Sequence, residues 1–110
     1  MSLKVRHRGG VDLIDLEGPL TGGPRADALR AAVDHLLAGG ARHIVVNLQA
    51  TPFIDSLGLG ELLACKKEAI ARGGDVGLLV LTGKVYGVLV DASLDRVFET
   101  FTDETAAVDA

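Results

Sequence analysis

The stretch Phe53-Ile54-Asp55-Ser56-Leu57-Gly58-Leu59-Gly60 decides how this chain folds. An apolar, β-branched run precedes it at 42–48, and apolar residues at helical spacing follow it at 59–70. A strand that leads into a helix leaves the first N–H groups of the helix without intrahelical partners. Serine is favoured at that point because its hydroxyl accepts one of those hydrogen bonds. We therefore place Ser56 at or next to a helix N-terminus, as its cap, on a loop held by the strand.

The sequence on both sides of this stretch predicts strands that alternate with helices. Residues 3–8 and 11–17, joined by Gly9-Gly10, are typical of a hairpin at a sheet edge. Pro24 begins a helix that Gly39-Gly40 ends. Further along come a buried strand at 76–81, a helical stripe at 85–92, a short strand at 97–101 and a helical turn from 102. We expect one α/β domain over residues 1–110, with a mixed sheet of four or five strands, an antiparallel N-terminal edge hairpin and helices mainly on one face.

Composition argues against several classes of protein. The formal net charge of −4 provides no basic surface for a nucleic acid. No apolar run reaches membrane-spanning length, so we expect no membrane insertion, and the start of the chain lacks the apolar core of a signal peptide. A single cysteine, Cys65, forms no internal disulfide and is expected to pack inside a helix. These features predict a cytoplasmic protein.

The remaining polar residues do not form a recognisable catalytic or cofactor motif. Asp12 and Asp15 fall on opposite faces of their strand, which favours solvated or edge-protecting charges. The three histidines lie on separate predicted elements, so we expect no metal site. The chain lacks a Gly-x-Ser-x-Gly elbow, a complete dinucleotide fingerprint and a phosphate loop. We therefore expect neither an enzyme nor a cofactor. Gly58 and Gly60 lower helix propensity, which indicates that the neighbouring sheet or a partner packs closely there.

Two families use a serine after an aspartate at a helix start. Asp55-Ser56-Leu57 resembles the attachment motif of acyl carrier proteins, which are small and acidic like this chain. Those carriers are four-helix proteins, however, and have no place for the three strongly apolar β-type runs found here. We keep the acyl-carrier-like interpretation only as an alternative to be tested.

A resemblance covering nearly the whole chain is stronger. The strand at 42–48, Phe53-Ile54-Asp55-Ser56, Gly58-Leu59-Gly60 and Arg72-Gly73-Gly74 resemble the STAS domain, and more narrowly the anti-sigma factor antagonists. The resemblance implies that a serine-kinase anti-sigma factor phosphorylates Ser56. The unphosphorylated antagonist would bind that kinase and free the sigma factor, so regulating transcription. Phosphorylation would block this binding, and a phosphatase would restore it. ATP and magnesium would belong to the kinase, and the antagonist itself would be a monomer or weak dimer.

The resemblance also implies a partner surface, with two departures from the family pattern. The expected partner-binding residues are Thr21, Asp55, Leu57, Gly58, Gly60 and Thr82. Leu57 stands where the family usually has Ser or Thr, and it is either a core residue or an exposed apolar contact. Thr21 stands where the family usually has an acidic residue. Some STAS proteins are unphosphorylated adaptors in transport or sensory complexes, and a Ser56 that only caps its helix would fit that group.

Overall fold

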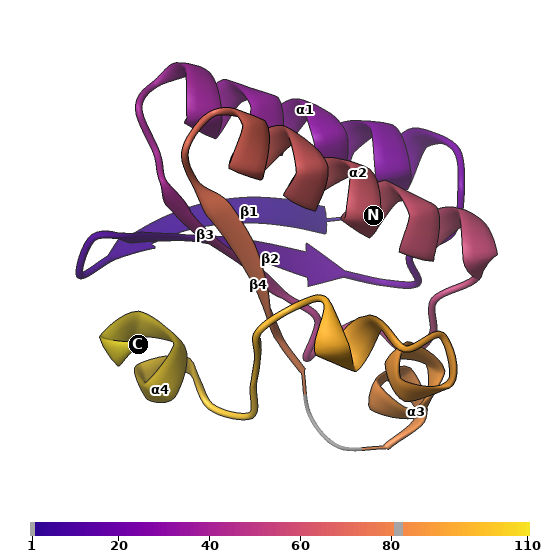
Figure 1. Ribbon diagram of the computed structural model, residues 1–110. Helices are drawn as coiled ribbons and strands as arrows, with labels where there is room; N and C mark the ends of the chain where they lie inside the picture. Colours follow the sequence, from indigo (N-terminus) through magenta and orange to yellow (C-terminus); the bar gives the residue numbers. More distant parts are fainter. Residues whose placement is uncertain (1, 81–82) are drawn as a thin grey trace.

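The computed structural model describes residues 2–80 and 83–110, which form one five-stranded sheet with helices on both faces (Figure 1). The strands, which lie side by side in chain order, are β1 Ser2–Arg8, β2 Val11–Glu17, β3 His43–Asn47, β4 Asp75–Leu79 and β5 Thr100–Phe101. The helices are α1 Pro24–Ala38, α2 Ser56–Ala71, α3 Lys84–Asp91, the 3-10 helix η1 Leu94–Arg96, and α4 Glu104–Asp109.

The sheet is mixed, as the sequence predicts. β1 and β2 form an antiparallel hairpin whose register runs from Ser2↔Glu17 to Arg8↔Val11. The turn between them uses Gly9 and Gly10, both with positive φ, a conformation that glycine adopts without steric cost. The β2–β3, β3–β4 and β4–β5 pairs are all parallel. A sheet of this kind has no counterpart in a four-helix carrier, so the acyl-carrier-like alternative is wrong.

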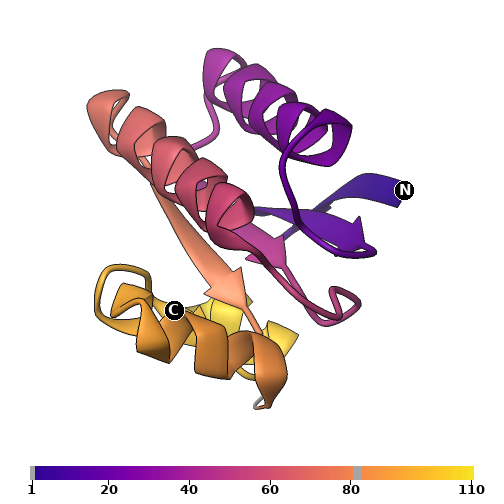
Figure 2. The same ribbon diagram turned by 90° about the vertical axis from the view of Figure 1, so that its right-hand side faces the viewer.

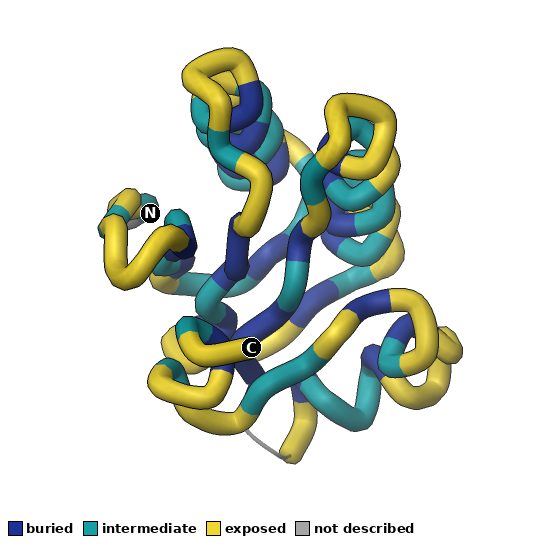
Figure 3. Tube along the Cα trace, turned by 60° about the vertical axis from the view of Figure 1, so that its left-hand side comes forward, coloured by how far each residue is buried: buried dark blue, intermediate teal, exposed yellow. Residues whose placement is uncertain are grey.

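Two apolar layers hold the sheet. Alternate residues of β2, β3 and β4 face α1 and α2, which lie side by side over the sheet (Figure 2), and α3 and η1 contribute to the same core. The opposite face carries a smaller cluster, formed by Val11, Leu13, Val45 and Leu79 with Ala107 of α4. Figure 3 shows that burial is concentrated along the central strands. The helices therefore lie mainly on one face, as predicted.

The strand predicted at 97–101 is shorter in the structure. The backbone N–H groups of Val97 and Phe98 both donate to the carbonyl of Leu94, which continues the turn of η1. Phe98 is buried in the main core, and the Lys66 ammonium lies 5.4 Å from its ring centroid. The demand for an apolar side chain in that core keeps Phe98 out of the sheet, and only Thr100–Phe101 pairs with β4. None of the helices in the described ranges has the length and apolar character needed to cross a membrane.

Candidate functional site

Two loops meet at the carboxyl edge of the sheet, where functional loops of open α/β sheets collect. One follows β2 at 18–23, and the other follows β3 at 48–55. The Leu20 N–H donates to the Phe53 carbonyl at 3.0 Å, and the Asp55 N–H donates to the Leu20 carbonyl at 3.3 Å. Leu20 and Ile54 form an isolated parallel bridge. The two loops are therefore joined through their backbones directly before α2 begins.

A buried threonine adds a third connection. Thr51 is 4% exposed, and its hydroxyl donates to the carbonyl of Leu16 in β2 at 3.2 Å. The Gly18 N–H donates to the Ala50 carbonyl at 3.0 Å. Because buried polar groups need such partners, these bonds favour one conformation of the loop.

Asp55, and not Ser56, is the cap of α2. Asp55 has extended backbone angles, and its Oδ1 accepts a hydrogen bond from the Gly58 N–H at 2.8 Å. Ser56 is the first helical residue and is exposed. The expected position of Ser56 is confirmed, but its expected capping role is wrong, because the preceding carboxylate takes that bond. Because Ser56 is exposed, its hydroxyl can reach solvent, and within residues 2–80 and 83–110 it has no hydrogen-bond partner.

The two glycines of α2 have different surroundings. A Cβ atom on Gly58 would overlap the carbonyl oxygen of Leu20 and would lie 3.0 Å from Ile54 Cγ2. Gly58 therefore permits close packing against the first turn of α2, as the sequence predicts, although the neighbour is the loop after β2 and not the sheet or a partner. A Cβ atom on Gly60 would meet nothing within 4 Å in this chain. A close approach at Gly60 stays a prediction about a partner.

Apolar side chains flank the exposed serine. Leu57 is 66% exposed and Phe53 is 43% exposed, which excludes Leu57 from the core. The Leu57 side chain lies against Gly22, so it reaches toward the loop that contains half-buried Thr21. Thr82, another expected contact residue, lies outside the described residues. At the same edge, a hollow of about 200 Å³ is lined by Leu48, Gln49, Thr51, Pro52, Val80, Lys84 and Val85.

The N-terminus of α2 can accommodate additional negative charge. The helix has 16 residues, and its first turn holds no acidic side chain after the cap. The aligned peptide dipoles place partial positive charge there, and the first N–H groups remain available to an acceptor. Since Gly58 N–H is already bonded to Asp55, the amides of Ser56 and Leu57 are the ones left for a phosphate oxygen.

The other candidate chemical groups lie elsewhere. Cys65 is buried in α2, and burial is the main cause that raises the pKa of its thiol to about 12, so it packs as predicted. His35 is exposed, as predicted, and His7 contacts Asp12 across the hairpin. Over residues 2–80 and 83–110, no three metal-binding side chains cluster.

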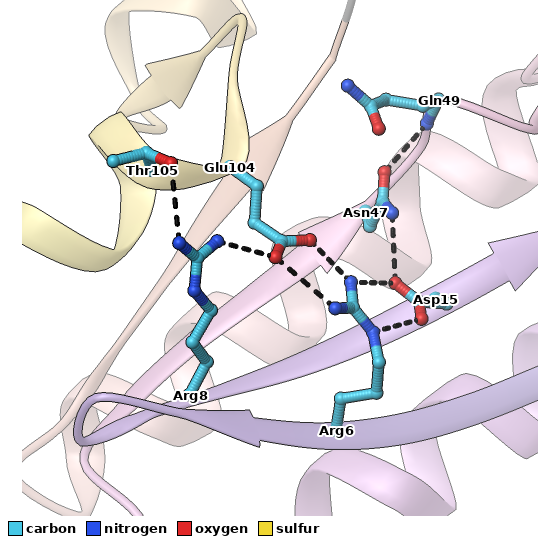
Figure 4. A network of polar contacts seen from close by, with 7 residues as sticks. All are labelled: Arg6, Arg8, Asp15, Asn47, Gln49, Glu104 and Thr105. Carbon is cyan, nitrogen blue, oxygen red and sulfur yellow. Dashed lines mark hydrogen bonds and ion pairs between the residues drawn. The ribbon is translucent and has the colours of Figure 1, made fainter.

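Asp15 differs from its expected role. It does lie on the face opposite Asp12, but it is half-buried in a polar network (Figure 4). Arg6 donates to both of its carboxylate oxygens, at 2.5 and 2.9 Å, and Asn47 Nδ2 donates to its Oδ1 at 2.9 Å. These hydrogen bonds, above all those from Arg6, hold the pKa of Asp15 below its ordinary value. The alternation of the predicted hairpin already puts Arg6 and Asp15 on one face, and that signal could have indicated their pairing.

The whole architecture matches a known family. A family model described as the STAS domain matches residues 2–107. The chain belongs to the STAS domain family. This STAS protein is 26% identical over 109 residues to the anti-sigma F factor antagonist of Paenibacillus polymyxa. The alignment covers 98% of this chain and 92% of that relative.

Solved structures share the STAS fold. The Thermotoga maritima protein TM1081 superposes with a TM-score of 0.87 at 24% identity, over 97% of this chain and 92% of that one. The anti-sigma factor antagonist SpoIIAA, in its unphosphorylated form, superposes with a TM-score of 0.77 at 25% identity, over 96% and 92% of the chains. A sulfate transporter family protein from Wolinella succinogenes shares the fold, with a TM-score of 0.67 at 18% identity over 91% and 83%. The STAS fold is therefore common to proteins of different function.

Proposed function

We propose that this STAS protein is an anti-sigma factor antagonist that binds a serine-kinase anti-sigma factor through residues 48–56, the Ser56 loop, and is switched off when that kinase phosphorylates Ser56. The observation that carries the proposal is the exposed hydroxyl of Ser56 at the first residue of α2, directly after a loop fixed by backbone hydrogen bonds. Because Asp55 is the cap, the hydroxyl is not needed to hold the helix. The similarity to a named anti-sigma F factor antagonist supports the same assignment.

The switch acts at the interface. Phosphorylation adds nearly two negative charges and three acceptor oxygens to Ser56. The N-terminus of α2 would tolerate this group, so the fold survives, while a docked partner would meet new charge beside Asp55. A loss of about 3 kcal/mol of interaction weakens binding roughly a hundredfold. A phosphatase that removes the group restores binding.

The contact residues have distinct roles in this proposal. Leu57 provides an exposed apolar contact, and Gly60 offers a position where a partner backbone can approach closely. Asp55 and Gly58 act by holding the loop, since one caps the helix and the other admits the Leu20 carbonyl. Thr21 and Thr82 remain proposed contacts. The protein works as a single cytoplasmic domain without catalytic activity, and ATP and magnesium belong to the kinase.

The test is a phosphorylation assay with purified serine-kinase anti-sigma factors from the same genome. We expect ATP and the kinase to add one phosphoryl group, seen by mass spectrometry, and Ser56→Ala to prevent it. Ser93→Ala is the matched control, because Ser93 is also exposed but lies after α3. Phosphate added to Ser56→Ala, or none added to the wild-type chain, would contradict the proposal.

The phosphomimetic variant tests the consequence for binding. Ser56→Asp is expected to weaken kinase binding while leaving the thermal midpoint nearly unchanged, since the hydroxyl makes no structural bond. A large fall in the thermal midpoint would mean instead that the position serves chiefly the fold.

A second candidate is an unphosphorylated adaptor in a transport or sensory complex. The similarity to a sulfate transporter family protein favours it as an architecture, and the exposed Leu57 suits an interface that is not modified. A chain that stays unmodified with its kinase, yet binds a transporter or sensor subunit, would identify it.

A further inference from the structure

The C-terminal helix α4 is held to the sheet by a small apolar contact and by ion pairs. It has six residues, too few to be helical without docking. Only Ala107 is fully buried, and Val108 is half-buried. A hollow of about 440 Å³ remains between α4 and the sheet, with Val45, Gly77 and Phe101 in its lining. The apolar contact of α4 therefore depends on two of its residues, Ala107 and Val108, which pack with the cluster on this face of the sheet.

Glu104, at the start of α4, attaches the helix to two arginines. Its Oε1 accepts from Arg6 at 2.5 Å, and its Oε2 accepts from Arg8 at 2.8 Å (Figure 4). Arg8 also donates to the hydroxyl of Thr105 at 3.4 Å. Both arginines are on β1, so α4 is attached to the edge strand of the sheet.

Arg6 also begins a continuous path of hydrogen bonds across the sheet. Arg6 lies between the carboxylates of Glu104 and Asp15 and donates to both. Asp15 Oδ1 also accepts from Asn47 Nδ2 at 2.9 Å, and Asn47 Oδ1 accepts from the Gln49 N–H at 3.0 Å. Asn47 ends β3, and Gln49 lies in the loop that leads to Ser56. Arg6 Nη2 donates to both carboxylates, and Asp15 Oδ1 accepts from both Arg6 and Asn47. Asn47 continues the path through its two amide atoms, since Nδ2 bonds Asp15 and Oδ1 bonds Gln49.

We propose that α4 is a releasable strap whose docking is coupled to the Ser56 loop through Glu104, Arg6, Asp15, Asn47 and Gln49. When Glu104 leaves, Arg6 loses one of its two carboxylates and turns fully to Asp15. That change alters the acceptor that Asn47 uses, and Asn47 in turn holds the first turn of the loop. Coupling is reciprocal, so a partner that displaces Gln49 also loosens α4. The link to regulation rests on the proposed function of Ser56, but the coupling itself does not.

The test is amide hydrogen exchange on the full chain by NMR, without kinase or phosphate, so its outcome is independent of the phosphorylation assay. The reporters are the Ala107 amide in α4 and the Gln49 and Thr51 amides in the loop. Glu104→Gln should speed exchange at Ala107 by about tenfold or more, because hydrogen bonds to a charged group are lost. It should also speed exchange at Gln49 and Thr51 severalfold.

A matched variant separates coupling from a general loss of charge. Glu68→Gln removes the 2.9 Å ion pair with Arg72 on α2, away from the path, and should leave all three reporters unchanged. Asn47→Ala, made at the other end of the path, should speed exchange at Ala107. The proposal is overturned if Glu104→Gln affects Ala107 alone. It is equally overturned if exchange rises uniformly, including at Val45 in the centre of the sheet, since the network would then be a simple structural clamp.

Discussion

The backbone carbonyl of Leu20 occupies the space in which Gly58 would carry a side chain. This contact brings the first turn of α2 against the loop after β2, and it exists only because residue 58 has no Cβ atom. The Leu20 carbonyl also accepts from the Asp55 N–H, so the contact lies within one residue of the exposed serine. The position of Ser56 therefore depends on a packing constraint at Gly58, in the same turn of α2.

Gly58→Ala should destabilise the protein. The added methyl overlaps a backbone oxygen, which cannot move without breaking the bonds between the two loops, and overpacking of this kind costs about 1–3 kcal/mol. Urea denaturation measures the loss. Gly60→Ala is the control, because its Cβ is unobstructed and alanine favours a helix by up to about 1 kcal/mol. Equal effects of the two substitutions would rule out the role assigned to the Leu20 contact.

Asp55→Ala should cost roughly 0.5–2 kcal/mol of unfolding free energy, because it removes the cap that bonds the Gly58 N–H. Ser56→Ala should change the free energy of unfolding by about 0.5 kcal/mol at most, as is usual for a surface side chain that makes no cap or buried contact. Thermal and urea unfolding of both variants provide the comparison. A larger loss for Ser56→Ala than for Asp55→Ala would return the capping role to the serine.

Leu57→Ala should weaken partner binding while stability stays within about 0.5 kcal/mol of the wild-type value. The side chain is 66% exposed, so its removal leaves no cavity in the free protein, but a docked partner loses an apolar contact. Titration calorimetry with the kinase measures the affinity. Ile70→Ala, 56% exposed near the far end of α2, is the control and should bind normally. If only Ile70→Ala lost binding, the interface would lie near the C-terminal end of α2 and not at Leu57.

Acid should destabilise the protein through Asp15 and Glu104. Hydrogen bonds from Arg6 lead the causes that hold the pKa of Asp15 below its ordinary 3.8, with Asn47 and Lys4 adding to them. Arg6 and Arg8 likewise hold the pKa of Glu104 below its ordinary 4.5. A carboxylate whose pKa is lower in the folded state stabilises it above the unfolded pKa, and that contribution is lost as pH falls through the folded pKa.

The free energy of unfolding should therefore begin to fall as the pH drops below about 4.5, the ordinary pKa of Glu104, and should fall further below about 3.8, that of Asp15. For these partly exposed groups we expect about 1 kcal/mol each, because solvent screens such pairs. Urea unfolding of the wild-type chain and Glu104→Gln across this range measures it. The variant should be less stable near neutrality and should lose less on acidification. If the unfolding free energy of both chains fell equally with pH, Glu104 would make no contribution to the acid sensitivity.

Local sequence was informative wherever a pattern has one structural solution. The apolar run at 43–47 is a strand buried on both faces, as predicted, because a β-branched run without alternation suits only a strand covered by two layers. The placement of Ser56 at the start of a helix was also correct. The choice of cap was wrong, since aspartate and serine are both favoured there and only the backbone angles, extended at Asp55, decide between them.

The polar network of Arg6, Asp15 and Glu104 shows what local sequence patterns cannot predict. The hairpin pattern placed Arg6 and Asp15 on one face, but nothing near them in the chain indicated that Glu104, 98 residues after Arg6, would complete the pair. Likewise, Phe98 left the predicted strand because the main core required its ring. Contacts between residues so far apart depend on the assembled sheet.

The sequence by itself determined the order of elements, the alternation of buried and exposed faces, and an exposed serine at a strand-to-helix turn, because these follow from side-chain periodicity and the needs of a helix end. Only the tertiary structure decided that Asp55 takes the cap, that Leu20 requires Gly58, and that α4 is tied to the Ser56 loop through Asn47. Each of these depends on backbone and side-chain atoms from separate elements meeting within a few ångströms, and local propensity carries no information about such meetings.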